Sequence, residues 1–306
     1  MGVIITATAV AAPGSERGST RHAAAAAAAC VRTAGITADD VDVLINTGIY
    51  RDANTVAPAV AALVQREIGM HLRPERDRAR PAALSFDLAN GACGPLNAVQ
   101  VASALLHTRA TYALVVSGDA HPSCRAPFTP PQPRFPYLTA GAAMLLERVD
   151  DPEVGFGPLS TATGEPDSPP IVRGYLDVSR MGRAGRHTVT VEQDPDHLPH
   201  LLDLVSRTAT SYAESHGIDL DRTLVVTGHP TPLFGRRVAS RLGIPATAAA
   251  TATGLGGDPH TSALTIAYHH HADRVQRDGF RHVLFVTAGA GPSAACVGYR
   301  PPRSAR

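Results

Sequence analysis

The two halves of this sequence repeat the same order of predicted elements, and this duplication limits the possible folds more than any other feature. The matching pairs are VDVLINTG (41–48) with RTLVVTGHP (222–230), YALVVSGD (112–119) with HVLFVTAG (282–289), and GAAMLLER (141–148) with SAACVGYR (293–300). Each half is predicted to run strand–helix–turn–helix–strand–strand. Two such halves indicate two mixed sheets with helices packed between and around them. We place the boundary between the halves at residue 150, which gives halves of 1–150 and 151–306.

The first half contains a cysteine at a predicted strand-to-helix junction. Leu84–Leu88 alternates apolar and polar residues, as a strand does, and an Asn-Gly-Ala turn leads from it to Cys93. Gly94 and Pro95 follow, and apolar residues then recur at helical spacing as far as His107. The dipole of a helix N-terminus favours a thiolate at Cys93, which makes it a candidate nucleophile. The alternative is that Cys93 serves only as a small, buried apolar side chain.

Two histidines in the second half are candidate partners of Cys93. His229 follows the predicted strand 223–227, and His260 ends a glycine-rich loop and begins a predicted helix. We expect Cys93 and His260 to occupy equivalent places in the two halves, so that their helix N-termini meet near a pseudo-two-fold axis. We then expect about 3–6 Å between functional atoms of Cys93, His229 and His260. The alternatives are that His229 is a turn residue and that His260 only caps a helix.

Composition excludes several classes of function. The net charge of +1 argues against nucleic acid or an anionic membrane as the main partner. All 28 basic residues are arginine, so a Schiff-base lysine is excluded. The four cysteines have no CxxC spacing, and no carboxylate or thiolate completes a ligand set with the histidine run 269–271, so we expect neither a metal site nor a disulfide scaffold. Without a signal peptide or a membrane span, we expect a soluble cytoplasmic protein.

A proline-rich stretch over residues 120–140 has little periodicity, and loops of this length in a compact domain are usually functional or mobile. His121, Arg125 and Phe128 in this stretch are candidate substrate-binding residues. Arg125 and Arg134 could meet a phosphopantetheine phosphate or an acidic carrier protein, although solvated loop charges explain them better. Among the other expected elements is a helix over Thr55–Ile68.

Four segments together resemble the thiolase-fold condensing enzymes, and within them the ketoacyl-ACP synthase III group. They are DLANGACGPLNAVQVASALL (87–106), VVTGHPTPLFGRRVASRLGIP (225–245), GGDPHTSALTIAYHH (256–270) and TAGAGPSAACVGYR (287–300). The resemblance extends from about Gly35 to the end of the chain. It implies an α/β thiolase-like fold, a duplicated α-β-α-β-α layered core with two mixed five-stranded sheets. It also implies a homodimer, in which we expect the sheets to pair near Tyr112–Ser117.

The resemblance implies a role for each candidate residue. Cys93 would attack an acyl thioester, and backbone N–H groups of Cys93 and of the Gly289–Gly291 turn would bind the oxyanion. His229 and His260 would donate to the enolate formed when a malonyl-type thioester loses CO₂. His260 stands where the synthase III group usually has asparagine, and the resulting Cys-His-His set resembles the elongating ketosynthases.

The expected activity is decarboxylative condensation in polyketide or fatty-acid-type specialised metabolism. We expect no bound cofactor; the acyl group would arrive on the phosphopantetheine of an acyl carrier protein or on coenzyme A. Two alternatives stay open: an acyltransferase on the same fold that uses an alcohol or amine acceptor, and a non-catalytic partner subunit of a ketosynthase.

Overall fold

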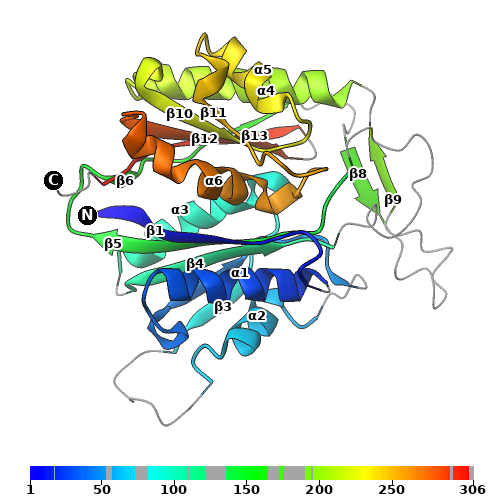
Figure 1. Cartoon of the computed structure of the whole chain (residues 1–306), viewed down its shortest axis with the longest axis vertical. Coiled ribbons are helices and arrows are strands. Elements are labelled where there is room, and N and C mark those ends of the chain that lie inside the picture. The colour runs from blue at the N-terminus through cyan, green and yellow to red at the C-terminus, as the bar shows by residue number, and fades with distance from the viewer. Residues whose placement is uncertain are drawn as a thin grey trace.

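The chain folds into five stacked layers that alternate between helices and sheets (Figure 1). The computed structural model describes residues 1–16, 18–52, 57–72, 82–108, 110–120, 136–164, 172–175, 190–193, 196–289 and 292–302, and the side chains of all of them except 172–175 and 190–193. The predictions made for His121, Arg125, Phe128, Arg134 and Gly291 lie outside the described residues.

Two mixed sheets form the framework. The first has the order β1 (Gly2–Ala11), β5 (Gly141–Val149), β4 (Tyr112–Gly118), β2 (Val43–Asn46) and β3 (Leu84–Asp87). The second has the order β11 (Ala249–Ala250), β10 (Thr223–Thr227), β12 (His282–Gly289), β13 (Ser293–Arg300) and β6 (Gly155–Phe156), with β7 (Ser160–Thr163) also paired to β13. A separate small sheet joins β8 (Val172–Tyr175) to β9 (Thr190–Gln193).

The duplication predicted from the sequence is confirmed by this topology. In each sheet the central strand has a parallel neighbour on one side, β2–β4 and β10–β12, and an antiparallel neighbour on the other, β4–β5 and β12–β13. The strands of the first sheet all precede residue 150, and those of the second all follow it. The second sheet has six strands rather than five because β6 and β7 share one edge position along β13.

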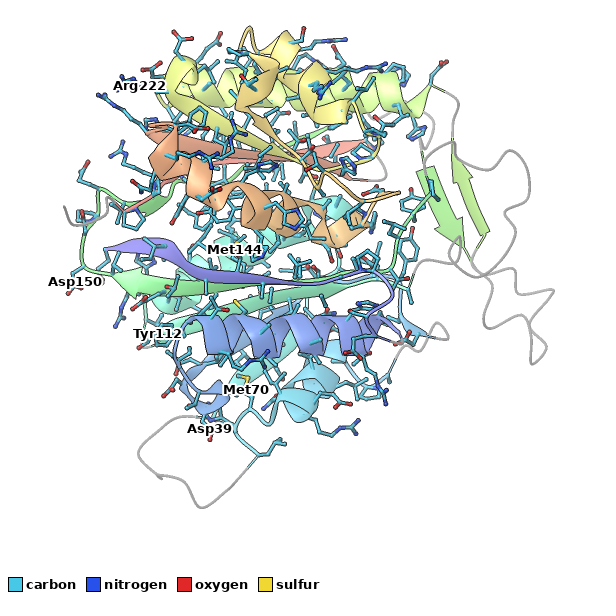
Figure 2. The ribbon with its side chains drawn as sticks, in the orientation of Figure 1. Asp39, Met70, Tyr112, Met144, Asp150 and Arg222 are labelled. Atoms are coloured by element: carbon cyan, nitrogen blue, oxygen red, sulfur yellow. The ribbon has the colours of Figure 1, made fainter. Side chains whose placement is uncertain are left out.

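The described part of the chain has six α-helices, which fill the three helical layers: α1 (Ser19–Thr33), α2 (Val60–Ile68), α3 (Gly94–Leu106), α4 (His197–Ser215), α5 (Phe234–Arg241) and α6 (Ala263–Arg277). α1 and α2 cover the outer face of the first sheet, α4 and α5 cover that of the second, and α3 and α6 lie between the sheets (Figure 1). The side chain of Met144 lies in the central layer near α3, whereas Met70 lies by α1 and α2 (Figure 2). Among the described residues, no helix has the length and apolar character needed to cross a membrane.

The start of α2 differs from the prediction. A helix was expected from Thr55, but α2 begins at Val60, and residues 53–56 lie outside the described part. The Asp87 carboxylate, at the end of β3, accepts hydrogen bonds from the backbone N–H groups of Val60 and Ala61 at 2.9 and 2.8 Å. A distant carboxylate therefore satisfies the first free donors of this helix, and local periodicity does not show such a partner.

The expected pairing of two copies near Tyr112–Ser117 is wrong, because β4 is hydrogen-bonded to a strand on each side. The edge strands of the first sheet are β1 and β3 instead. The N–H groups of Leu84 and Leu88 donate toward β2. In a strand the alternate residues direct their backbone groups to the opposite side, so Ser85 presents its N–H and C=O at the outer edge.

Candidate active site

Cys93 lies where the two halves of the molecule meet. It is the third residue of a short 3₁₀ turn, η3 (Gly91–Cys93), which leads directly into α3, with Pro95 in the first helical turn. The side chain is buried, and Sγ lies 4.0 Å from the carbonyl oxygen of Thr287 and 3.9 Å from the Ser293 hydroxyl. The candidate nucleophile from the first half is therefore packed against β12 and β13 of the second half.

Gly289, at the end of β12, allows the backbone to approach the sulfur. A Cβ atom at this position would lie 3.4 Å from the Cys93 sulfur and 2.9 Å from the Ser293 hydroxyl oxygen. The backbone N–H of Gly289 also interacts favourably with the ionised form of Cys93. A donor on this side of the nucleophile can bind the carbonyl oxygen of an acyl group that the sulfur attacks, where the oxyanion forms.

Burial controls the ionisation of Cys93. It raises the pKa of the thiol to about 11, against the opposing effect of hydrogen bonds from Ser293 and from the Gly289 backbone. Desolvation therefore opposes the thiolate that the helix N-terminus favours. Burial raises the pKa of Cys30 to about 12 and that of Cys296 further. Cys93 has the lowest pKa of the three cysteines in the described part of the chain.

His229 follows β10, the parallel neighbour of β12. Thr227 is in register with Val286, so the chain two residues further on runs beside the end of β12. A Cβ atom on Gly228 would lie 3.0 Å from the Thr287 hydroxyl oxygen, which shows how closely these two segments approach. His229 is buried, and burial lowers its pKa. The imidazole is therefore neutral at neutral pH and able to accept a proton.

His260 begins the corresponding 3₁₀ turn, η9 (His260–Ser262), which leads into α6. Its backbone has φ of +50°, and its N–H donates to the Asp258 carboxylate at 2.9 Å. The rings of Tyr50 and Tyr137 lie 5.2 and 5.8 Å from its ring. Left-handed backbone at a residue other than glycine is uncommon and clusters at functional sites, and here a buried carboxylate stabilises it.

A second buried carboxylate, Asp119, faces the His260 ring. Its Oδ2 lies 3.4 Å from Nδ1 of His260 and also accepts hydrogen bonds from the N–H and hydroxyl of Thr261. Burial lowers the pKa of His260, but Asp119 and Asp258 raise it by more, so the pKa is raised overall. Burial raises the pKa of Asp119, but His260 and the hydrogen bonds lower it by more. Burial raises the pKa of Asp258 to about 6.

The structure refines the expected equivalence of Cys93 and His260. Both belong to three-residue turns that precede a central helix, but Cys93 is the third residue of η3 and His260 is the first of η9. The residue equivalent to His260 is Gly91, whose φ is also +50°. η3 packs directly against η9, so the segments that carry Cys93 and His260 are in contact. The distances predicted among Cys93, His229 and His260 stay a prediction.

Sequence reasoning missed Asp119, Asp258 and Ser293. The duplication could have indicated Asp119, because YALVVSGD aligns with HVLFVTAG and places Asp119 at the position of Gly289. Gly289 faces Cys93 in η3, and Asp119 faces His260 in η9. Applying the repeat to side chains as well as to strands would have predicted the Asp119–His260 pair.

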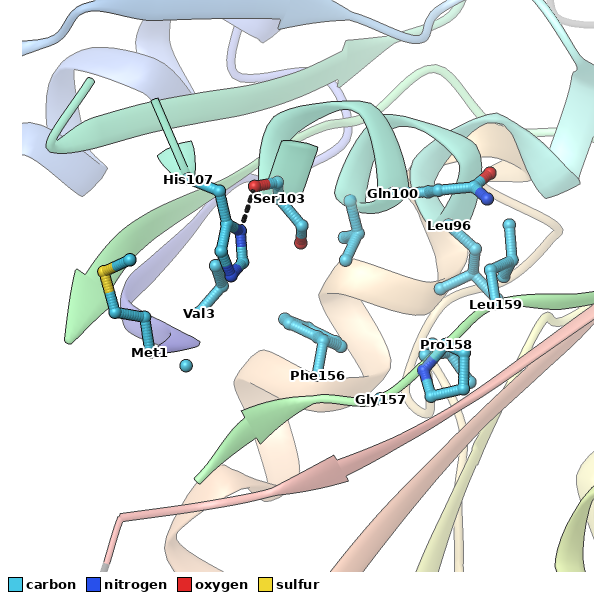
Figure 3. A pocket seen from close by; sticks show the side chains of 13 residues that line it. Met1, Val3, Leu96, Gln100, Ser103, His107, Phe156, Gly157, Pro158 and Leu159 are labelled. Atoms are coloured by element: carbon cyan, nitrogen blue, oxygen red, sulfur yellow. Dashed lines mark hydrogen bonds between the residues drawn. The ribbon is translucent and has the colours of Figure 1, made fainter. Parts of the chain in front are cut away.

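A cavity of about 360 Å³ runs along α3 beyond the candidate site (Figure 3). Its wall from α3 begins at Leu96, which packs in the same core cluster as Cys93, and ends at His107. The remaining walls come from the start of β1 and from the segment around β6, and they include Val3, Phe156 and Leu159. The lining combines apolar side chains with Gln100, Ser103 and His107.

No group of histidine, cysteine and carboxylate side chains in the described part of the chain could hold a metal ion. In the run on α6, His269 instead places Nδ1 2.9 Å from the Thr8 hydroxyl.

Comparison with solved structures assigns the fold. Two mixed sheets enclosing α3 and α6, with a cysteine at the start of one central helix, define the thiolase fold. Within it, this chain has the fold of the 3-oxoacyl-(acyl carrier protein) synthases III. The enzyme FabH from Pseudomonas aeruginosa PAO1 superimposes with a TM-score of 0.75 at 17% identity, covering 100% of both chains.

Two further solved structures have the same fold. OleA from Xanthomonas campestris with cerulenin bound gives a TM-score of 0.75 at 17% identity, covering 98% of this chain and 97% of its own. AbyA1, a tetronic acid condensing enzyme, gives a TM-score of 0.75 at 16% identity, covering 97% of this chain and 98% of its own. No model of a known protein family matches the sequence, and neither does the sequence of any curated protein.

Proposed function

We propose that this protein is a ketosynthase III-like condensing enzyme that loads an acyl group onto Cys93 and condenses it with a malonyl-type thioester. The observation that carries the proposal is the buried Cys93 thiol at the start of a central helix, with the Gly289 backbone N–H beside its sulfur. The fold it shares with 3-oxoacyl-(acyl carrier protein) synthase III supports the same reaction class.

In the loading half-reaction, Cys93 must lose its proton, because burial raises its pKa to about 11. His229 is the base we assign, since burial lowers its pKa and keeps its imidazole neutral. The sulfur attacks the thioester carbonyl, and N–H groups of Cys93 and Gly289 bind the oxyanion. The tetrahedral intermediate then expels the donor thiol, which takes the proton. The donor is the phosphopantetheine of an acyl carrier protein or coenzyme A.

In the condensing half-reaction, the bond from the malonyl carbon to its carboxylate breaks and CO₂ leaves. The electron pair forms an enolate, whose oxygen accepts hydrogen bonds from His229 and His260. The enolate carbon attacks the acyl carbonyl on Cys93, and the thiolate of Cys93 leaves as the new carbon–carbon bond is completed. We propose that the reaction belongs to polyketide or fatty-acid-type specialised metabolism.

One observation favours a second candidate function. A carboxylate behind an imidazole, as Asp119 lies behind His260, is also the arrangement that makes histidine a general base. A base at this position would deprotonate an alcohol or amine, and the protein would then be an acyltransferase on the same fold. A non-catalytic subunit is the third candidate, and it predicts that Cys93 carries no acyl group.

One experiment separates the three candidates. The protein is incubated with acyl-coenzyme A or an acyl carrier protein thioester, and intact mass and peptide mapping locate the acyl group. Malonyl thioester, or an alcohol or amine, is then added, and CO₂ and products are measured. We expect acyl-Cys93 followed by CO₂ release, with loading abolished in Cys93→Ala and retained in the matched control Cys30→Ala. Acylation without CO₂ release, but with transfer to an alcohol or amine, would favour the acyltransferase.

The remaining parts of the proposal concern partners and location. We propose an acyl carrier protein as partner, a homodimer as the functional unit, and the cytoplasm as the compartment. Size measurement in solution and co-purification with a phosphopantetheinylated carrier test the first two.

A further inference from the structure

We propose that Asp119 is a positioning residue that holds His260 as an imidazolium in a fixed orientation, with Nδ1–H toward the carboxylate, so that the Nε2–H of His260 serves as the donor to the enolate. The inference rests on the proposed condensing function. It assigns a role to the Asp119 side chain. Asp119 lies 142 positions before Thr261 in the sequence, and the fold brings it against η9.

The Asp119 carboxylate is held from both sides. It is fully buried at the end of β4, and its Oδ1 accepts hydrogen bonds from the backbone N–H groups of Ile49 and Tyr50, each at 2.8 Å. Its Oδ2 accepts from the N–H and hydroxyl of Thr261 at 3.2 and 2.5 Å. Four donors from two elements leave this carboxylate little freedom to move, and donors to the charged form favour its ionisation.

The same Oδ2 is the acceptor nearest to Nδ1 of His260. The contact of 3.4 Å has the geometry of an ion pair rather than of a short hydrogen bond. Nδ1 is buried and has no hydrogen-bond partner within the described residues. A buried ring N–H needs an acceptor, so the Nδ1–H points to Asp119. Both ring nitrogens carry a proton only in the imidazolium, which the Asp119 carboxylate balances, and its Nε2–H then remains for the substrate.

The other groups around His260 have different roles. The Asp258 carboxylate accepts from the backbone N–H of His260 rather than from its ring, so it stabilises the left-handed backbone. Tyr50 and Tyr137 contact the ring with their aromatic faces and edges, and the turn that carries Cys93 packs against η9. Asp119 is the group positioned to act on the ring nitrogen.

This arrangement suits decarboxylation. As CO₂ leaves, negative charge moves onto the enolate oxygen, and a fixed Nε2–H stabilises it without any proton leaving the site. The buried Asp119 carboxylate balances an imidazolium charge and keeps that donor available near neutral pH. An asparagine amide donates without such a partner, so dependence on Asp119 is specific to a chain with histidine at 260.

A double-mutant cycle tests the inference with wild type, Asp119→Asn, His260→Asn and the double variant. We expect Asp119→Asn to reduce CO₂ release from malonyl thioester by about 10²-fold or more, while Cys93 acylation changes by less than about threefold. In the His260→Asn background the same Asp119 change should have little further effect. Equal losses in both backgrounds would show a purely structural role and overturn the proposal.

A matched control and a spectroscopic readout complete the test. Asp258→Asn removes a charge of the same sign near His260 but keeps an oxygen for the backbone hydrogen bond. We therefore expect it to reduce CO₂ release less than Asp119→Asn does. An equal loss would overturn the proposal, because charge alone would then explain both variants. If Asp119→Asn does not fold, ¹⁵N NMR of the wild-type imidazole decides. Nδ1 must stay protonated and the pKa of His260 must exceed the ordinary histidine value of 6.5, and the opposite result refutes the pair even if no condensation is detected.

Discussion

The ionisation of Cys93 gives a quantitative test of how burial shapes the candidate site. Burial raises its pKa from 9.0 to about 11, a shift of about two units after the opposing hydrogen bonds are included. At a pH below both pKa values, each unit by which the pKa rises lowers the thiolate fraction tenfold. At pH 7.5 the buried thiol should therefore hold about 100-fold less thiolate than an unperturbed cysteine.

The assay is alkylation by iodoacetamide between pH 6 and pH 11, with peptide mapping to follow Cys93 by itself. The pH midpoint of the rate is the useful quantity, because limited access to a buried sulfur slows the reaction at every pH without moving the midpoint. We expect the rate to keep rising to about pH 11, whereas the same cysteine in urea should titrate near its ordinary value. A plateau below pH 8 would refute the reasoning, since it would mean that the helix N-terminus or a neighbouring histidine outweighs desolvation.

Three further predictions concern the site and the assembly. Gly289→Ala should slow Cys93 acylation by about 10²-fold or more, because its methyl group would crowd the sulfur and disturb a backbone donor; the control Gly256→Ala, where a Cβ meets no atom within 4 Å, should keep wild-type loading. Asp258→Asn should stabilise the fold by up to about 3 kcal/mol at pH 8 and by nothing near pH 4. The folded pKa of Asp258 is raised to about 6, so its ionisation costs stability as pH rises through 4–6, and urea unfolding at both pH values checks the sign. Ser85→Pro should convert a β3-paired dimer to a folded monomer by light scattering, because proline removes an outward N–H at the sheet edge; an unchanged dimer would place the interface elsewhere.

Local sequence patterns were enough to predict the architecture. Apolar periodicity and glycine turns placed β4, β12 and the two central helices, because those preferences act over a few neighbouring residues. The repeat of these patterns then fixed the topology, since two copies of one unit must bury equivalent faces. Cys93 was found in the same way, from a turn and a helix start within about ten residues.

What the sequence left undetermined depends on contacts between distant segments. α2 begins at Val60 because Asp87 from β3 satisfies its first N–H groups, and no local pattern contains that partner. The pKa of the Cys93 thiol is raised because the second half of the chain covers it, and desolvation is a property of the packed core. The sequence by itself placed Cys93 and His260 at the starts of the two central helices. Only the tertiary structure decided their positions along the two turns and the groups that shift their pKa values, because Asp119 reaches His260 across the interface between the two halves.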